Sequence, residues 1–186
     1  MFYIPAIPEP REELTGGFTN IDSDHKLIHD GYGLAFTDYR TLTNAQVFSY
    51  SFKAPATRFV HLKNILLQSL GGSIKLEILN GVDVTVDTGT TVPLTNLNDN
   101  ATNVCGCTMK EAPTFTGGTA VRTMYALADA SNKYTGIANL AANPNEEYVT
   151  KSEETYYIIR LTNLTTDDIP VAISGFLYSE DKGLAS

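Results

Sequence analysis

Residues 156–174 of this chain read YYIIRLTNLTTDDIPVAIS, and this stretch decides the fold class. Large apolar side chains recur at every second position on either side of a polar turn at 163–168. Successive side chains of a β-strand point to opposite faces, so each half predicts a strand with one buried face. The stretch therefore predicts a hairpin of two half-buried strands. Their buried faces are expected to carry Tyr157, Ile159, Leu161, Ile169, Val171 and Ile173.

The same alternation recurs upstream in several short runs. These runs cover residues 47–52, 73–78, 82–87 and 121–125. Residues 58–67, RFVHLKNILL, fit a strand or a short helix, and their β-branched and aromatic content favours the strand. No window shows the apolar stripe of an amphipathic helix. Many short strands with almost no helix predict an all-β fold, an antiparallel β-sandwich with a jelly-roll-like arrangement.

Glycine-containing turns separate these runs. Gly71-Gly72 lies between two of them, and Gly117-Gly118 precedes the run at 121–125. Asn80-Gly81 predicts a type I′ hairpin turn, because both residues tolerate the positive φ that this turn requires. The segments 88–119 and 127–149 are long for hairpin loops, so we expect them to project from the sandwich and carry contacts.

The first residues differ from the rest of the chain. Residues 1–20 contain Pro5, Pro8 and Pro10, which exclude a regular helix and favour an extended arm. We therefore divide the chain into an extended Pro-rich arm at 1–20 and a single β-sandwich domain at 21–186. The arm is either a loose terminus or a tether to a neighbouring surface. In the second case the partner-binding residues are the apolar ones, Phe2, Tyr3, Ile4 and Ile7.

Composition excludes several classes of partner. The 186-residue chain carries a net charge of −8 with no basic cluster, which disfavours binding to nucleic acid or to an anionic membrane. The N-terminus lacks the basic start and apolar run of a secretory signal, and no stretch approaches the length of a transmembrane helix. Two cysteines do not make a disulfide framework. We expect a soluble protein made in a cytoplasm.

Possible metal ligands are few. His25 and His29 have the spacing of a zinc pair on a helix, but the sequence around them favours a strand or turn, where the pair would not converge. Cys105 and Cys107 lack further ligands nearby and are expected to be free thiols. The segment 22–24, Asp-Ser-Asp, opens like a calcium loop but lacks the later glycine and glutamate. No metal site and no cofactor are predicted.

Catalytic motifs are equally scarce. The acidic pairs 146–147 and 153–154 have the residue type used in glycoside hydrolysis, yet such pairs are far more often solvated turns. The sequence contains no G-x-S-x-G, no Walker A and no G-x-G-x-x-G motif. The ten tyrosines leave sugar binding open as an alternative. We therefore predict that the protein is not an enzyme and assign no catalytic residue.

A family resemblance adds to this interpretation. It is carried by HDGYGLAFTDY at 29–39, RFVHL at 58–62, GTTVP at 89–93, NLNDN at 96–100 and ETYYIIRLTN at 154–163, followed by the run 171–178 and Glu180. Their order resembles a group of tailed-bacteriophage virion structural proteins of the head decoration or cement type. The resemblance covers residues 26–180 and leaves the arm outside. Leu97 and Asp99 stand where that group would have basic residues.

The resemblance implies a virion structural protein on the capsid exterior, assembled in the cytoplasm of the bacterial host. Its partners would be the major capsid protein or other virion subunits, and copies of itself in a homo-oligomer that is by analogy a trimer. Such a decoration protein would bind and stabilise the head shell through its arm and loops. The alternative is a tail or fibre module that binds a host receptor or carbohydrate, which the long Asn/Thr-rich loops favour.

Overall fold

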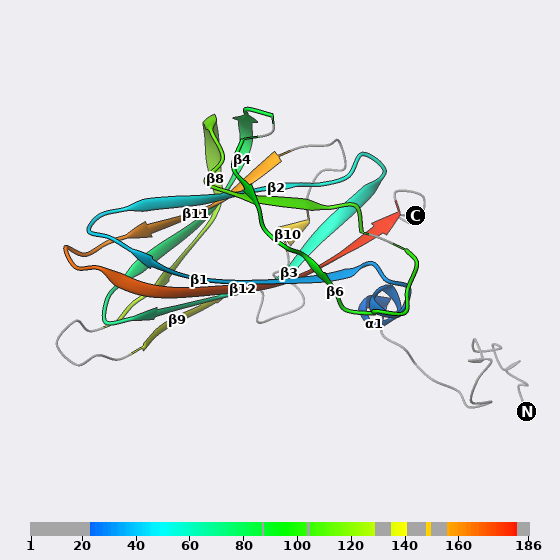
Figure 1. Ribbon diagram of the computed structural model, residues 1–186, viewed down its shortest axis with the longest axis horizontal. Coiled ribbons are helices and arrows are strands. Elements are labelled where there is room, and N and C mark those ends of the chain that lie inside the picture. The colour runs from blue at the N-terminus through cyan, green and yellow to red at the C-terminus, as the bar shows by residue number, and fades with distance from the viewer. Residues whose placement is uncertain are drawn as a thin grey trace, which may run out of the picture.

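The computed structural model describes residues 23–86, 88–103, 105–128, 135–140, 148–149 and 156–181. Within these residues two antiparallel sheets pack against each other, and a short helix lies at one end of the sandwich (Figure 1). The predicted antiparallel β-sandwich is confirmed. The elements are α1 (Ser23–His29), β1 (Gly33–Leu42), β2 (Val47–Lys53), β3 (Arg58–Leu70), β4 (Ile74–Val84), β5 (Thr90–Thr91), β6 (Thr95–Asn96), β7 (Thr108–Glu111), β8 (Phe115–Ala126), β9 (Thr135–Leu140), β10 (Tyr148–Val149), β11 (Tyr156–Asn163) and β12 (Ile169–Asp181).

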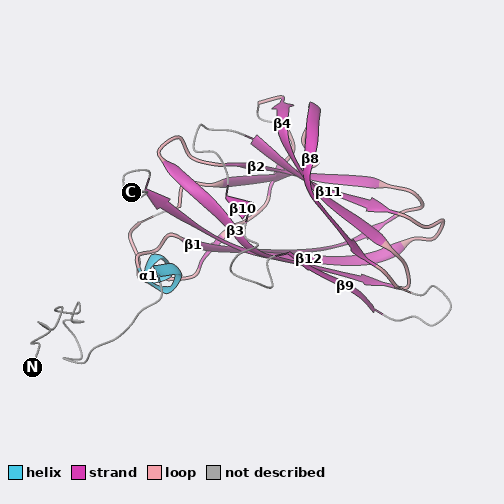
Figure 2. Cartoon of the chain, turned by 180° about the vertical axis from the view of Figure 1, so that it is seen from behind, coloured by secondary structure: helices cyan, strands magenta, loops and turns pink. Residues whose placement is uncertain are grey.

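The strand order is that of a jelly roll. The first sheet has the order β10-β3-β12-β1-β6, with β9 also paired to β3, and the second has the order β5-β7-β2-β11-β4-β8. Among the described strands of six or more residues, β1, β3, β9 and β12 form one sheet and β2, β4, β8 and β11 the other (Figure 2). Thus β9-β3-β12-β1 faces β2-β11-β4-β8, which is the eight-stranded jelly-roll connectivity.

Strands β11 and β12, which come from the stretch at 156–174, lie in the middle of their sheets. Ile159 of β11 pairs with Tyr50 on one side and with Ile78 on the other. Strand β12 lies between β1 and β3. The alternation predicted from the sequence is confirmed, because the expected inward residues are all buried in the main core. They are Tyr157, Ile159, Leu161, Ile169, Val171 and Ile173.

The connection between these two strands is not the predicted hairpin. Strand β11 pairs with β2 and β4, whereas β12 pairs with β1 and β3, so residues 164–168 cross from one sheet to the other. Alternation fixes which face of a strand is buried, but it does not choose the partner strand. Asn163 anchors the crossing: its buried Nδ2 donates hydrogen bonds to the carbonyls of Leu42, Thr43 and Asp167 at 3.2, 3.0 and 2.7 Å.

Asn80-Gly81 does not form the predicted hairpin turn either. Strand β4 runs unbroken from Ile74 to Val84, and β8 pairs beside it past this dipeptide, so the two strands extend together from the sandwich (Figure 1). Gly81 has a φ of 65° and Gly118 in β8 has a φ of 103°. The positive φ that the dipeptide permits is therefore used inside a continuous strand. Gly117-Gly118 lies within β8 rather than before it.

Residues 23–29 form a helix, which corrects the expected strand or turn around His25 and His29. A seven-residue helix is too short to be stable by propensity alone, so its neighbours must hold it. Three asparagine amides donate to the carbonyls at its C-terminal end, where a helix leaves acceptors without partners. The pairs are Asn98 with His29 (2.5 Å), Asn103 with Asp30 (2.9 Å) and Asn96 with Gly31 (3.1 Å). We call these three residues the asparagine clamp.

The two long segments are more regular than expected. Strands β5 and β7 of the segment 88–119 extend the second sheet, and β6 pairs with β1 in the first. In the segment 127–149, the described parts include β9 and β10, which pair with β3. These strands are short or lack a clean alternation, so the sequence pattern did not reveal them.

Candidate binding surface

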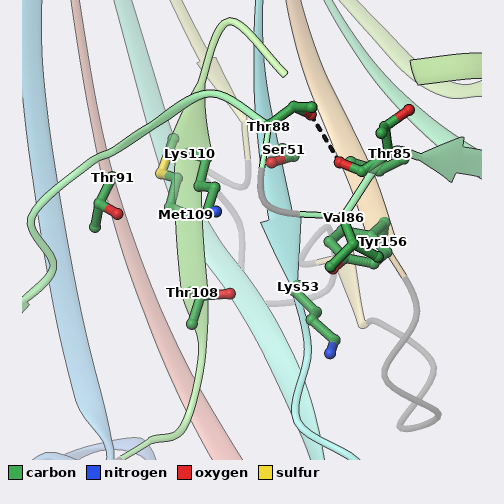
Figure 3. Close-up of a pocket in the computed structure, with 11 residues that line it drawn as sticks. Ser51, Lys53, Thr85, Val86, Thr88, Thr91, Thr108, Met109, Lys110 and Tyr156 are labelled. Carbon is green, nitrogen blue, oxygen red and sulfur yellow. Dashed lines mark hydrogen bonds between the residues drawn. The ribbon is translucent and has the colours of Figure 1, made fainter. Parts of the chain in front are cut away.

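A hollow of about 290 Å³ lies on the outer face of the second sheet (Figure 3). Strands β2, β5, β7 and β11 contribute to it together with the end of β4 and the segment that follows. Its size is near the lower limit of small-molecule sites. The lining residues are Ser51, Lys53, Val84, Thr85, Val86, Thr88, Thr91, Thr108, Met109, Lys110 and Tyr156.

Strand pairing brings the polar side chains of β2 and β7 together. In β2, Tyr50 and Phe52 belong to the core, so Ser51 and Lys53 point to the opposite face. The register places Lys110 of β7 opposite Ser51, and Thr108 opposite Lys53. The floor of the hollow is therefore a set of paired, outward-facing polar residues on a regular sheet, and their positions are fixed by the core beneath them.

The segment after β4 closes one side through its own hydrogen bonds. The Thr88 hydroxyl donates to the Thr85 carbonyl at 2.7 Å (Figure 3), and it accepts from the Thr114 amide at 2.9 Å. Gly89, with a φ of 84°, lets the chain pass close to β7, because a Cβ there would lie 2.3 Å from the Glu111 carbonyl oxygen. This wall of the hollow is therefore held by backbone contacts.

Two lysines lie among the described residues that line the hollow. Among the described residues that line it, the charged ones are Lys53 and Lys110. The Lys53 ammonium lies 5.5 Å from the centre of the Tyr156 ring, which is within cation–π distance. Two ammonium groups beside threonine hydroxyls and an aromatic ring suit a ligand with carboxylate, sulfate or hydroxyl groups.

An ion-pair cluster continues the same outer face. Arg160 of β11 donates from Nε and from a terminal guanidinium nitrogen to Glu77 Oε2 at 3.0 and 2.8 Å, and Lys75 Nζ lies 3.1 Å from the same oxygen. Burial opposes ionisation of Glu77, but these hydrogen bonds outweigh it and hold the pKa of its carboxyl below the ordinary value. The outer face therefore carries more cationic than anionic groups at this point.

A second ionic network joins the two sheets. Arg40 of β1 forms an ion pair with Asp38 on the same strand, and it reaches Glu111 Oε2 of β7 at 2.6 Å. The Tyr50 hydroxyl of β2 donates to Asp38 Oδ2 at 2.5 Å, and the Arg40 guanidinium lies 3.5 Å from the centre of the Phe48 ring. Strands β1 and β7 belong to different sheets, so this network bridges them, and we assign it a structural role.

The histidines are placed differently from one another. His25 and His29 both belong to the short helix α1, four positions apart in the chain. His61 is buried in β3, where its ring stacks on Tyr178 at 4.5 Å and its Nε2 lies 3.0 Å from Glu180 Oε1. The described ranges contain no group of three or more His, Cys, Asp or Glu side chains that would hold a metal ion.

Several residues singled out in the sequence lie outside the described residues. They are the arm residues Phe2, Tyr3, Ile4 and Ile7, and also Asp22, Glu146, Glu147, Glu153 and Glu154. Ser23 and Asp24, from the segment that resembles a calcium loop, are the first two residues of α1 rather than part of a loop. Cys105 and Cys107 are free, as expected, with their sulfurs 2.8 Å apart.

The lining of the hollow was not found from the sequence. The position of Lys53 is predictable, because it follows Phe52 in an alternating strand and must point outward. Its neighbours Thr108 and Lys110 come from β7, a four-residue strand that the alternation did not reveal. Without the β2–β7 pairing, the two lysines share no recognisable motif.

No model of a known protein family matches the chain. A search of curated proteins also finds no match.

Proposed function

We propose that this chain is a structural protein of a tailed-bacteriophage virion, most simply a decoration or cement protein that binds and stabilises the outside of the capsid shell. The observation that carries the proposal is the eight-stranded jelly-roll connectivity, an architecture that capsid proteins use. It supports the resemblance of residues 26–180 to phage decoration proteins, because that resemblance implies a β-sandwich. No catalytic residue is assigned.

The packing of the domain suits a cement role. Large side chains from both sheets fill one continuous core, including Tyr50, Phe52, Leu62 and Ile65, each at most 1% exposed. A domain of this kind keeps its outer faces and loops in fixed positions. Fixed positions favour repeated docking on a regular shell, since little conformational entropy is lost when each copy binds.

The start of the domain supports a tethering role for residues 1–20. The first described element is α1, which begins at Ser23, and the asparagine clamp fixes the C-terminal end of that helix. A segment attached to a fixed helix transmits a load to the domain rather than unravelling it. The apolar residues Phe2, Tyr3, Ile4 and Ile7 are the proposed contacts with a capsid subunit or with a neighbouring copy of the chain.

Capsid binding with matched arm variants tests this function. Mature heads of the cognate phage are mixed with the full chain, with a variant in which the four apolar arm residues are alanine, and with a control that replaces Glu9, Glu12 and Glu13 by alanine. Co-sedimentation and the temperature at which heads release DNA are measured. The apolar variant should bind weakly and give no stabilisation, while the acidic control should behave as the full chain. Failure of the full chain to bind heads would contradict the proposal.

The hollow supports a second candidate, a tail or fibre module that binds a host receptor or carbohydrate. Lys53, Lys110 and Tyr156 provide two cations and an aromatic face within one site. A glycan array with the full chain tests this function, compared with Lys53→Ala/Lys110→Ala and with Lys26→Ala on the exposed surface of α1. Saturable binding that is lost in the double variant and kept in Lys26→Ala would favour this function over the first.

A further inference from the structure

Cys105 and Cys107 lie just before β7 with their sulfurs 2.8 Å apart. Cys105 is 1% exposed and Cys107 is half-buried. Gly106 between them has a φ of 75°, a conformation that glycine adopts without strain. Alternate residues of an extended strand are separated by about 6.5 Å along the chain, so the left-handed glycine is what allows the two thiols to converge.

A buried cation and a hydroxyl group lie at this pair. Arg58, at the start of β3, is 8% exposed, and its Nε and a terminal nitrogen donate to the Ser179 hydroxyl and carbonyl oxygens, both at 2.9 Å. Its guanidinium carbon lies 3.6 Å from the centre of the Tyr32 ring. The Ser179 hydroxyl in turn hydrogen-bonds to the Cys105 sulfur. The arginine is therefore held in place from two sides, next to the dithiol.

This environment favours one thiolate and one thiol. The hydrogen bond from Cys107, with smaller contributions from Ser179 and the charge of Arg58, lowers the pKa of Cys105 to about 7 against the opposing effect of burial. The same hydrogen bond, together with burial, raises the pKa of Cys107. Near neutral pH the pair therefore holds a nucleophilic sulfur beside a protonated one, which is the arrangement of a reactive cysteine with a resolving partner.

We propose that Cys105 and Cys107 form a redox site that a peroxide oxidises to an intrachain disulfide and that a thiol reductant restores. This site is independent of the capsid function. The Cys105 thiolate attacks one oxygen of hydrogen peroxide, so that an S–O bond forms, the O–O bond breaks and the released hydroxide takes up a proton. The Cys107 sulfur then attacks Cys105, the S–S bond forms, the S–O bond breaks, and the Cys107 proton leaves with the hydroxide as water.

The geometry favours a disulfide over a metal as the product of this pair. The sulfurs need to approach by only about 0.8 Å to reach the covalent distance. A zinc ion needs four ligands, and the described residues bring no third Cys, His, Asp or Glu to the two thiols. The low exposure of Cys105 restricts the oxidant to a small molecule, and hydrogen peroxide meets that requirement.

The oxidised product can be identified on the full-length reduced protein. One equivalent of hydrogen peroxide is added at pH 7, the protein is unfolded in iodoacetamide, and its intact mass is measured. The expected product has lost two hydrogen atoms, takes up no alkyl group and regains two alkylation sites after dithiothreitol. Cys105→Ser and Cys107→Ser should give no such product. Unreacted thiols, an interchain disulfide, or sulfinic acid on one cysteine would each overturn the proposal.

The pH dependence of the thiolate tests the role of Arg58 as a positioning residue. At pH 7 the thiolate fraction of the wild type should be about 15-fold that of a thiol with the ordinary pKa of about 8.5. The half-point is the pH at which the rate of the reaction with peroxide reaches half its maximum. Arg58→Gln should move this half-point to higher pH, and Arg58→Lys should restore part of the shift. Arg160→Gln, on the outer face, should leave the half-point unchanged. If Arg58→Gln does not fold, Arg58→Met, which keeps the length of the side chain and removes its charge, provides the same test. An unchanged half-point in the folded variant would refute the role of the arginine.

Discussion

Replacing Arg40 by methionine measures how much the ionic network between the sheets stabilises the fold. Methionine keeps apolar contact with Phe48 but removes the ion pairs with Asp38 and Glu111. Breaking a fully buried ion pair costs about 3–5 kcal/mol, and an exposed pair contributes about 0–1 kcal/mol. The Arg40 and Asp38 side chains are 17% and 24% exposed, which is between these limits. We expect the free energy of unfolding to fall by about 1–3 kcal/mol at pH 7.

The cost of this substitution should depend on pH. Burial opposes ionisation of Asp38, but hydrogen bonds from Tyr50 and Arg40 outweigh it and hold the pKa of Asp38 below its ordinary value of 3.8. A carboxyl whose pKa is lower in the folded state stabilises the fold above its unfolded pKa, and this contribution is lost as the pH falls through the folded pKa. The cost should therefore be complete at pH 7 and shrink below about pH 4.

Urea unfolding followed by far-UV circular dichroism at pH 7 and pH 3 measures both quantities. The matched control is Arg122→Met on the exposed side of β8, which should change the free energy of unfolding by less than about 0.5 kcal/mol. Two results would refute the reasoning. One is an equal cost for the two variants at pH 7, and the other is a cost for Arg40→Met that persists unchanged at pH 3.

Three further predictions concern the core, the β4–β8 ribbon and the helix clamp. Ile159→Ala, at a site 1% exposed, should lower the free energy of unfolding by about 2–5 kcal/mol in urea, whereas Ile137→Ala, at a site 59% exposed, should lower it by less than about 0.5 kcal/mol. Gly118→Ala places a Cβ 2.6 Å from Val82 and should reduce the melting temperature more than Gly81→Ala, which has the same sign of φ and nothing within 4 Å. Asn98→Ala removes a hydrogen bond to the helix end, so it should cost about 1 kcal/mol and speed hydrogen exchange of the α1 amides.

The sequence predicted the fold class where burial follows a simple period. Tyr157, Ile159 and Leu161 recur at every second position because one face of β11 is covered by the main core, although Ile158 on the other face is also buried, in a smaller cluster with Leu79 and Val84. The pattern did not predict which strands pair, since pairing depends on contacts between residues far apart in the chain. It also misread Asn80-Gly81, because a dipeptide that permits a turn does not require one when a glycine pair lies in the adjacent strand.

The candidate site was less predictable than the fold. Lys53 could be placed on the outer face from its neighbour Phe52, but its site is completed by β7, whose four residues carry little periodic signal. The helix at 23–29 was missed for a related reason. Its stability comes from Asn96, Asn98 and Asn103, whose hydrogen-bond partners at the helix end are 65, 69 and 73 positions away in the sequence.

The jelly roll gives the domain two distinct poles. Gly33 pairs with Tyr178, so α1 and the end of β12 lie at one pole, while the ten residues of β1 lead about 30 Å away to the other. There the turns near Ala45, Ser73 and Thr165 meet through backbone hydrogen bonds. If the protein is held to a particle by the segment before Ser23, these turns are the natural place to graft a foreign epitope for display, because an insertion there leaves the attachment pole undisturbed.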